Sequence, residues 1–185
     1  LKAEVAKALS CDRVPVITVG SHDTACAVAA VPAGPERWAY ISSGTWSLVG
    51  AEVEAAIIND KTYEHQFTNE GGVAGTVRLL KNSTGLWLVQ QCRQQWQREG
   101  REYSYGELTR LAGQARPFAA HIDPNAQAFL TPGAMADTIN THLKETGQQA
   151  ITDKGQLVRV ILESLSLNYR EILERLEDIT GQAAE

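Results

Sequence analysis

Three segments of this chain carry polar side chains in patterns that suit chemistry. The first is Gly20-Ser21-His22-Asp23-Thr24, which joins a β-branched apolar run to an alanine-rich stretch. In open α/β sheets, ligands bind where a strand ends and a helix begins. The helix dipole favours the charged form of a carboxylate in the first turn, so Asp23 can accept a proton. Asp23 is therefore a candidate general base, and an ordinary first-turn or N-cap acid is the alternative.

The second segment, Ile41-Ser42-Ser43-Gly44-Thr45-Trp46-Ser47, reads as a turn between two strands and is rich in small hydroxylated residues. Such a turn can direct backbone N–H groups and hydroxyls at phosphate oxygens. It has neither the spacing nor the lysine of a Walker loop. An ordinary hairpin turn is the alternative interpretation.

The third segment is Leu80-Lys81-Asn82-Ser83-Thr84-Gly85-Leu86, preceded by the polar block Thr68-Asn69-Glu70-Gly71-Gly72. Asn82 stands before a predicted helix, so it either contacts a ligand or caps that helix. His22 is a possible partner of Asp23 or a donor to a ligand. The remaining histidines are expected at the surface: His65, His121 and His142.

The elements that must position these residues follow from hydrophobic periodicity and from turn residues. Strands are expected at residues 14–20, 38–42, 46–53, 67–69 and 76–80, with Gly71-Gly72 in a hairpin turn between the last two. Helices are expected at residues 1–9, 24–31, 86–98, 108–114, 134–145 and 156–179. Capping signals are Ser104, Thr131 followed by Pro132, Asp153 and the terminal Gly181.

Composition excludes several classes of protein. A length of 185 residues fits one domain with a substantial core. The net charge of −5 argues against nucleic-acid binding, which needs a basic face. No apolar run approaches the roughly 18 residues of a membrane helix, and no signal peptide is expected. Cys11, Cys26 and Cys92 lack the spacing of a disulfide framework or a zinc site, so we expect a cytoplasmic protein with reduced thiols.

Four blocks in a fixed order resemble the second domain of the FGGY sugar kinases. They are Ser21-His22-Asp23-Thr24-Ala25, Ser42-Ser43-Gly44-Thr45-Trp46-Ser47-Leu48, Thr68-Asn69-Glu70-Gly71-Gly72, and Leu80-Lys81-Asn82 with Gly85-Leu86-Trp87-Leu88 and Gln90. The first two blocks separate this subgroup from glycerol and xylulose kinases. Beyond residue 91 the match is looser, although His121-Ile122-Asp123-Pro124-Asn125 and the last helix fit.

The resemblance implies an α/β fold of the ribonuclease H-like, actin-type ATPase class, a mixed sheet with helices. Two such domains form a cleft in these kinases, with the sugar at its base and ATP across its mouth. By the same resemblance Asp23 is the catalytic base, the sugar is bound by His22, Asp23, Thr24 and Asn82, and ATP is contacted by Gly44, Thr45 and Gln90. No metal ligand is assigned here, because the ligands of Mg²⁺ are expected mostly in the first domain.

Residues 1–185 are accordingly predicted to be a second kinase domain that lacks the first domain and the C-terminal adenosine-binding segment. Both ends of the chain look like cuts. The implied activity of the whole enzyme is transfer of the γ-phosphoryl group of ATP to the 1-hydroxyl of L-rhamnulose, with the isolated fragment inactive. The alternatives are a kinase for another deoxyketose, such as L-fuculose, and a non-catalytic actin/ribonuclease H-like binding module. The expected partners are the sugar, ATP and the first domain, with no nucleic acid or membrane.

Overall fold

A four-stranded sheet lies at the centre of the computed structural model, which describes residues 1–185 except 12–13, 18, 21, 35–37, 182 and 184–185. The strands are β1 (Tyr40–Ser43), β2 (Trp46–Val53), β3 (Thr68–Gly71) and β4 (Val77–Thr84). Their order in the sheet is β1-β2-β4-β3, and each neighbouring pair is antiparallel. Four of the five predicted strands are confirmed, as is the turn that follows Gly71.

Seven α-helices accompany the sheet in the described part of the chain, and most begin within three residues of the predicted start. They are α1 (Ala3–Ala8), α2 (Asp23–Ala29), α3 (Asp60–Glu64), α4 (Trp87–Arg98), α5 (Tyr105–Gln114), α6 (Met135–Glu145) and α7 (Lys154–Thr180). A short 3-10 helix spans Gln127–Phe129. Only α3 and this 3-10 turn were not predicted, and both are too short for a periodic pattern. The predicted α/β class, a sheet with helices, is confirmed.

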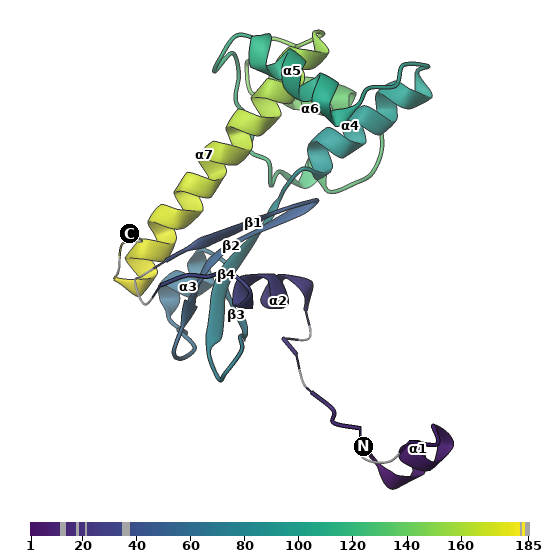
Figure 1. Ribbon diagram of the computed structural model, residues 1–185. Coiled ribbons are helices and arrows are strands. Elements are labelled where there is room, and N and C mark those ends of the chain that lie inside the picture. The colour runs from purple at the N-terminus through teal and green to yellow at the C-terminus, as the bar shows by residue number, and fades with distance from the viewer. Residues whose placement is uncertain (12–13, 18, 21, 35–37, 182, 184–185) are drawn as a thin grey trace.

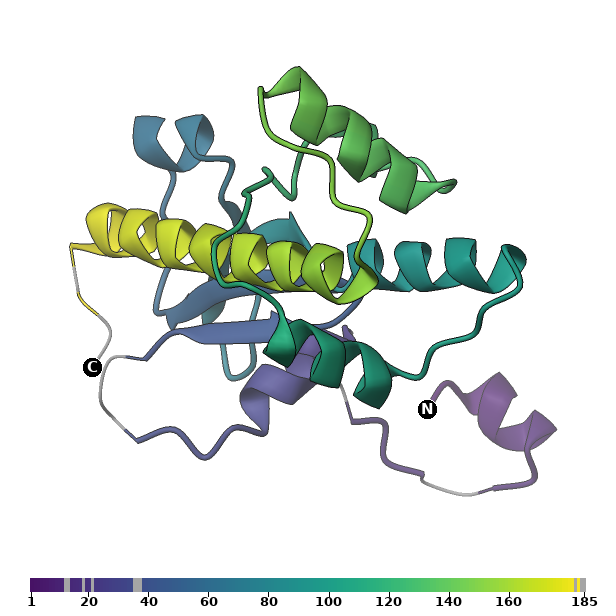
Figure 2. The same ribbon diagram turned by 90° about the horizontal axis from the view of Figure 1, so that it is seen from above.

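The two faces of the sheet are covered by different helices. Side chains alternate between the faces of a strand, so Val49 and Leu79 point to one face while Leu48 and Leu80 point to the other. The first pair packs against α7, together with Ile172, Leu176 and Ile179. The second pair packs against Val28 of α2. Figure 1 and Figure 2 show α7 and α2 on opposite sides of the strands.

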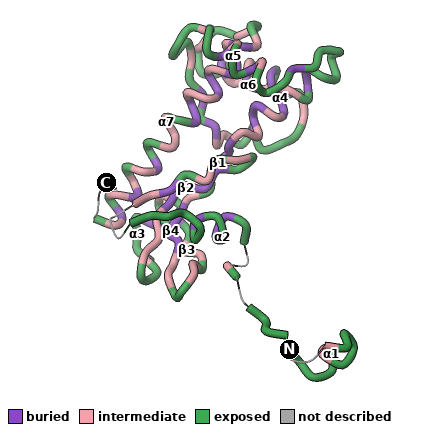
Figure 3. Tube along the Cα trace, viewed as in Figure 1, coloured by how far each residue is buried: buried purple, intermediate pink, exposed green. Residues whose placement is uncertain are grey.

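The largest core lies beyond the sheet, among α4, α5, α6 and the first half of α7. It includes the fully buried Leu88, Leu108, Ile139 and Ile161, one from each of these helices. Figure 3 shows buried positions along the facing sides of these helices, whereas α1 contains no buried residue. The long helix α7 therefore joins the helical group to the sheet.

Three of the four predicted capping signals are present, including Gly181, which ends α7 in the left-handed conformation, and one is wrong. Ser104 Oγ accepts a hydrogen bond from Glu107 N (3.1 Å), and an Asp153 carboxylate oxygen accepts one from Gln156 N (2.7 Å). Thr131 does not cap α6, which begins at Met135 without a side-chain cap from its own N-terminal residue. Instead Gln95 of α4 reaches across, and its Oε1 accepts from Ala136 N at 2.8 Å. A partner from another helix has replaced the local cap.

The predicted strand at residues 14–20 is not formed in its described part, 14–17 and 19–20. Val16 and Ile17 are 67% and 80% exposed. A strand is held by hydrogen bonds to a neighbouring strand, and Figure 1 shows this segment leading away from the sheet. The β-branched composition of this segment is therefore not sufficient to make it a strand, because no strand of the described chain lies beside it.

The β1–β2 turn docks on the beginning of α4. Gly85 N and Trp87 N donate to Thr45 O (3.2 and 3.1 Å), and Leu86 N donates to Gly44 O (2.8 Å). A β-carbon at Gly85 would lie 2.5 Å from Gly44 O and 2.6 Å from Ser47 Oγ. The absence of a side chain at residue 85 is therefore what allows the turn and the helix to meet.

Replacing Gly85 with alanine tests this contact. The added β-carbon meets backbone that cannot move without breaking the three hydrogen bonds, so we expect Gly85→Ala to lower the free energy of unfolding by about 1–3 kcal/mol. Gly113→Ala in α5 is the control, because a β-carbon there has no heavy atom within 4 Å. That variant should be neutral or slightly more stable, since alanine favours helix. Urea denaturation measures both, and equal effects would contradict the close approach.

Candidate functional site

Two of the predicted ATP-contacting residues meet in the structure. Gln90, in the first turns of α4, donates from Nε2 to the hydroxyl of Thr45 at 3.1 Å. The residues are 45 positions apart in the sequence, and the docked turn brings them together. Thr45 is exposed. The Gly44 N–H donates to Trp46 O (3.1 Å), so this amide is occupied inside the turn and the Thr45 hydroxyl is the group that the turn presents.

A cavity of about 350 Å³ opens beside Gln90, between α4, α5 and α7. This is a volume in the range of small-molecule sites. Its walls are mainly apolar, with the Gln90 amide and the Tyr105 ring as the main polar or aromatic features; the lining residues are Leu86, Val89, Gln90, Tyr105, Leu108, Thr109, Val158 and Leu162. The Arg93 guanidinium lies 4.9 Å from the centre of the Tyr105 ring, a cation–π contact that orients the ring.

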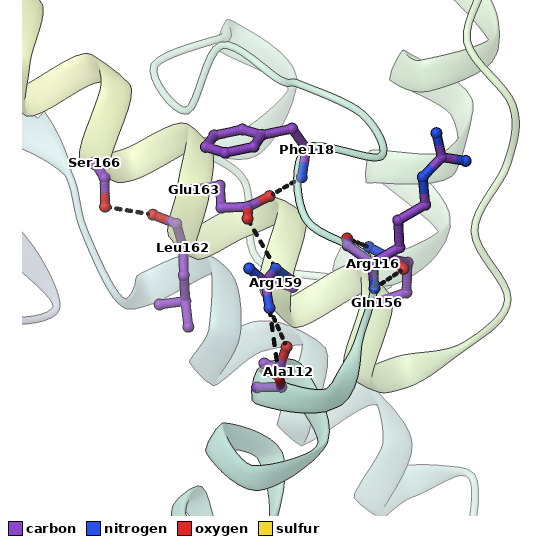
Figure 4. Close-up of polar contacts among 9 residues, drawn as sticks. Ala112, Arg116, Phe118, Gln156, Arg159, Leu162, Glu163 and Ser166 are labelled. Carbon is purple, nitrogen blue, oxygen red and sulfur yellow. Dashed lines mark hydrogen bonds and ion pairs between the residues drawn. The ribbon is translucent and has the colours of Figure 1, made fainter.

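A second groove of about 480 Å³ adjoins this cavity between α5 and α7, and the two share Thr109 and Leu162. Two of its charged groups, Arg159 and Glu163, are paired with each other, as Figure 4 shows. Arg159 Nε binds a Glu163 carboxylate oxygen at 2.8 Å, and the other oxygen accepts from Phe118 N at 2.8 Å. Arg159 also donates to Ala112 O (3.2 Å) at the end of α5. These contacts hold the loop at Phe118 to α7 and engage both Arg159 and Glu163.

The predicted base and its neighbours gather at the start of α2. Asp23 is the first residue of the helix, and its side chain is 93% exposed, as predicted. One carboxylate oxygen accepts from Thr24 N (2.7 Å) and lies 3.3 Å from His22 Nδ1. Thr24 itself is buried. The carboxylate is thus held by its neighbours while its outer side is open to a ligand.

Asn82 lies within β4 and is exposed. The alternative that Asn82 caps the following helix is wrong, because α4 has Leu86 at its N-cap position and no side-chain cap. Asn82 pairs with Leu48 and lies two residues after Leu80 in the same strand. All three side chains are therefore on the face of the sheet that α2 covers. The candidate sugar contacts at residues 22–24 and Asn82 therefore share one face.

No hydrogen bond among the described residues joins the Asp23 group to the Thr45–Gln90 pair or to Asn82. The structure forms two groups: one at the start of α2, and one at the turn and the start of α4. Each is built by a helix N-terminus beside the sheet. Tyr105 was missed by sequence reasoning, because its only signal was its place behind the Ser104 cap.

Burial accounts for the unusual acid–base groups outside these two clusters. It raises the pKa of Tyr40 to about 12 and raises the pKa of the buried Cys92 thiol, while it lowers the pKa of Lys81 on the α7 face. The three cysteines are free. The described residues contain no cluster of three or more metal-binding side chains, and none of their helices is long and apolar enough to cross a membrane.

Comparisons with known proteins identify relatives over the whole chain. The chain is 45% identical over 185 residues to the rhamnulokinase of Bacteroides thetaiotaomicron, covering 100% of this chain and 37% of that protein. It is 41% identical to the rhamnulokinase of Ligilactobacillus salivarius, covering 91% of this chain and 34% of that protein. The corresponding values for the rhamnulokinase of Bacillus subtilis are 40%, 92% and 34%. The chain thus spans about a third of the length of these relatives.

Among solved structures, a xylulose kinase from Bifidobacterium adolescentis superposes with a TM-score of 0.49 at 19% identity, covering 80% of this chain and 27% of that one. The family model for the C-terminal domain of the FGGY family of carbohydrate kinases matches residues 39–185. This match contains the Thr45–Gln90 pair and Asn82, while Asp23 precedes it. The chain belongs to the FGGY family of carbohydrate kinases.

Proposed function

We propose that this chain is part of an ATP-dependent kinase that phosphorylates the 1-hydroxyl of L-rhamnulose. The observation that carries the proposal is the Thr45–Gln90 contact beside an apolar cavity, which suits the phosphates and the base of a nucleotide. The relatives named rhamnulokinase, 40–45% identical, support the choice of sugar. They are about three times as long, so the remaining parts of the cleft come from the rest of the polypeptide.

In the proposed reaction the 1-oxygen of the sugar attacks the γ-phosphorus and ADP leaves with the electrons of the broken P–O bond. Asp23 takes the proton of the attacking hydroxyl. Phosphoryl transfer requires positioning and charge neutralisation more than covalent help, and the Thr45 hydroxyl donates to a γ-phosphate oxygen. Gln90 keeps the Thr45 hydroxyl in place through their 3.1 Å hydrogen bond.

The sugar would lie over the start of α2, on the sheet face that carries Asn82. His22 and Asn82 are exposed and supply hydrogen-bonding groups for the other hydroxyls. Thr24 is buried, and its N–H donates to the Asp23 carboxylate. We therefore propose that Thr24 orients the Asp23 carboxylate, and that Asp23 rather than Thr24 contacts the sugar.

The cavity beside Gln90 would hold the adenine base of ATP, because its apolar walls and the Tyr105 ring suit a planar aromatic group. Mg²⁺ supplies neutralisation of phosphate charge in such reactions. As the family resemblance implies, we assign the ligands of Mg²⁺ mostly to the first domain of the whole enzyme. The unpaired cysteines suit the reducing cytoplasm, where we place the enzyme.

A chimeric enzyme tests the proposed function. In the Bacteroides thetaiotaomicron rhamnulokinase, the matched segment is replaced by this chain, so that the relative provides the rest of the cleft. We expect the chimera to phosphorylate L-rhamnulose, and this chain alone to show no phosphorylation, because base, metal ligands and nucleotide clamp must converge. A coupled ADP-release assay on a sugar panel measures both. A preference of the chimera for L-fuculose, or activity of the isolated chain, would contradict the assignment.

Asp23→Asn in the chimera tests the base. The amide cannot accept the proton, so we expect turnover to fall by about 10²–10⁴-fold, the usual contribution of a general base. The thermal unfolding midpoint should stay unchanged, because the side chain is 93% exposed. Asp60→Asn is the matched control, since Asp60 is also an exposed acid that begins a helix. Similar turnover in the two variants would refute the role of Asp23.

A further inference from the structure

Two fully buried serines lie directly behind the β1–β2 turn. Ser47 of β2 and Ser83 of β4 face each other across the strand pair. Their exposed fractions are 0% and 1%. A buried hydroxyl destabilises a fold unless it is hydrogen-bonded, and alanine or valine would fill such positions without that requirement. The hydrogen-bond partners of the two serines therefore determine whether these residues stabilise the fold.

Consecutive residues of α7 bind these serines. Tyr169 Oη lies 2.6 Å from Ser47 Oγ, and Asn168 Nδ2 donates to Ser83 Oγ at 2.7 Å. One turn of the long helix thus holds both strands at the same point of their ladder. This point is where β2 and β4 meet the turn and the start of α4.

Asn125 completes a closed ring of side chains. Its Oδ1 accepts from Ser83 Oγ (3.1 Å) and from Thr84 N (2.9 Å), while its Nδ2 donates to Asn168 Oδ1 (3.2 Å). Asn125, Asn168 and Ser83 are each bonded to the other two. Asn125 ends the His121-Ile122-Asp123-Pro124-Asn125 segment, and the proposed reaction gives that segment no role.

The ring lies next to the backbone that holds the docked turn. Thr84, bound by Asn125, is followed by Gly85, Leu86 and Trp87, whose N–H groups hold the carbonyls of the turn. On the other strand, Ser47 follows the turn by two residues and fills the space that Gly85 leaves. Any shift of this ring along α7 would therefore move the hydroxyl of Thr45.

Further along α7, Ile172, Leu176 and Ile179 make an apolar contact with the sheet. Apolar burial is non-directional, so it resists separation of the helix and the sheet more than sliding between them. Hydrogen bonds weaken steeply when their distance and angle change. The polar ring therefore determines where the end of the sheet sits along α7.

We propose that Asn125, Asn168 and Tyr169 are positioning residues for the Gly44-Thr45 turn, acting through Ser83, Thr84 and Ser47. Their link to ATP rests on the function proposed above, whereas their hold on the turn does not. The buried polar groups are kept because they specify one placement of the Thr45 hydroxyl. Apolar replacements would preserve packing and lose this placement.

Amide hydrogen exchange of this chain tests the hold on the turn without any activity. Asn125→Ala should speed exchange at Gly85 and Leu86 about tenfold, the factor that corresponds to one lost hydrogen bond. Asn140→Ala is the matched control, because Asn140 also clamps backbone, donating to Ile151 O (3.0 Å) and accepting from Ile151 N (2.6 Å). It should leave those two amides unchanged. Equal exchange in both variants would overturn the proposal.

Tyr169→Phe keeps the packing and removes only the hydrogen bond to Ser47, so this variant replaces Asn125→Ala in the exchange experiment if Asn125→Ala does not fold. Unchanged exchange at Gly85 and Leu86 in Tyr169→Phe would also overturn the proposal.

In the chimera, Asn125→Ala should raise KM for ATP about tenfold and leave KM for the sugar unchanged, which a general loss of stability would not do. An inactive chimera with faster exchange in the variant would remove the kinase function but keep the positioning role. An active chimera in which Asn125→Ala alters neither the exchange nor KM for ATP would keep the kinase function and remove the positioning role.

Discussion

The site depends on the docking of the β1–β2 turn against the first residues of α4. Three backbone hydrogen bonds join the two, and they are possible because Gly85 has no side chain. The same contact carries Thr45 to Gln90 and sets both beside the apolar cavity. A local steric requirement at one glycine thus determines the arrangement of groups that are far apart in the sequence.

The long helix α7 connects this junction with both cores of the protein. Its first half packs with α4, α5 and α6, and its second half covers the sheet. Between these halves, Asn168 and Tyr169 bind the serines behind the turn. Apolar burial supplies the adhesion and directional bonds supply the placement, a division of roles that explains the half-buried polar side chains of Asn168 and Tyr169 at this junction.

Sequence reasoning succeeded where structure is local and failed where a distant partner decides. The last helix, predicted at residues 156–179, and its Asp153 cap follow from spacing within the segment, and both are confirmed. The segment at 14–20 has the composition of a strand, but pairing requires a neighbour that the described chain does not provide. Thr131 had the local signal of a cap, and Gln95 of another helix supplies the bond instead.

The candidate site divides in the same way. Residue types indicated Asp23, Thr45 and Asn82, and resemblance added Gln90, but only the folded chain shows that Thr45 and Gln90 touch. The burial of Thr24 could not be read from its polar type. The ring around Ser83 joins residues 41 to 85 positions apart, so no sequence pattern within one element could have indicated it.

The most direct test of the central claim is a crystal structure of the chimera with L-rhamnulose and a non-hydrolysable ATP analogue. The decisive measurement is the distance between the Asp23 carboxylate and the 1-oxygen of the sugar. We predict about 2.6–3.2 Å, hydrogen-bonding reach, with the Thr45 hydroxyl bound to the γ-phosphate. A sugar whose 1-hydroxyl lies out of reach of Asp23, or a nucleotide whose phosphates do not contact Thr45, would contradict the account.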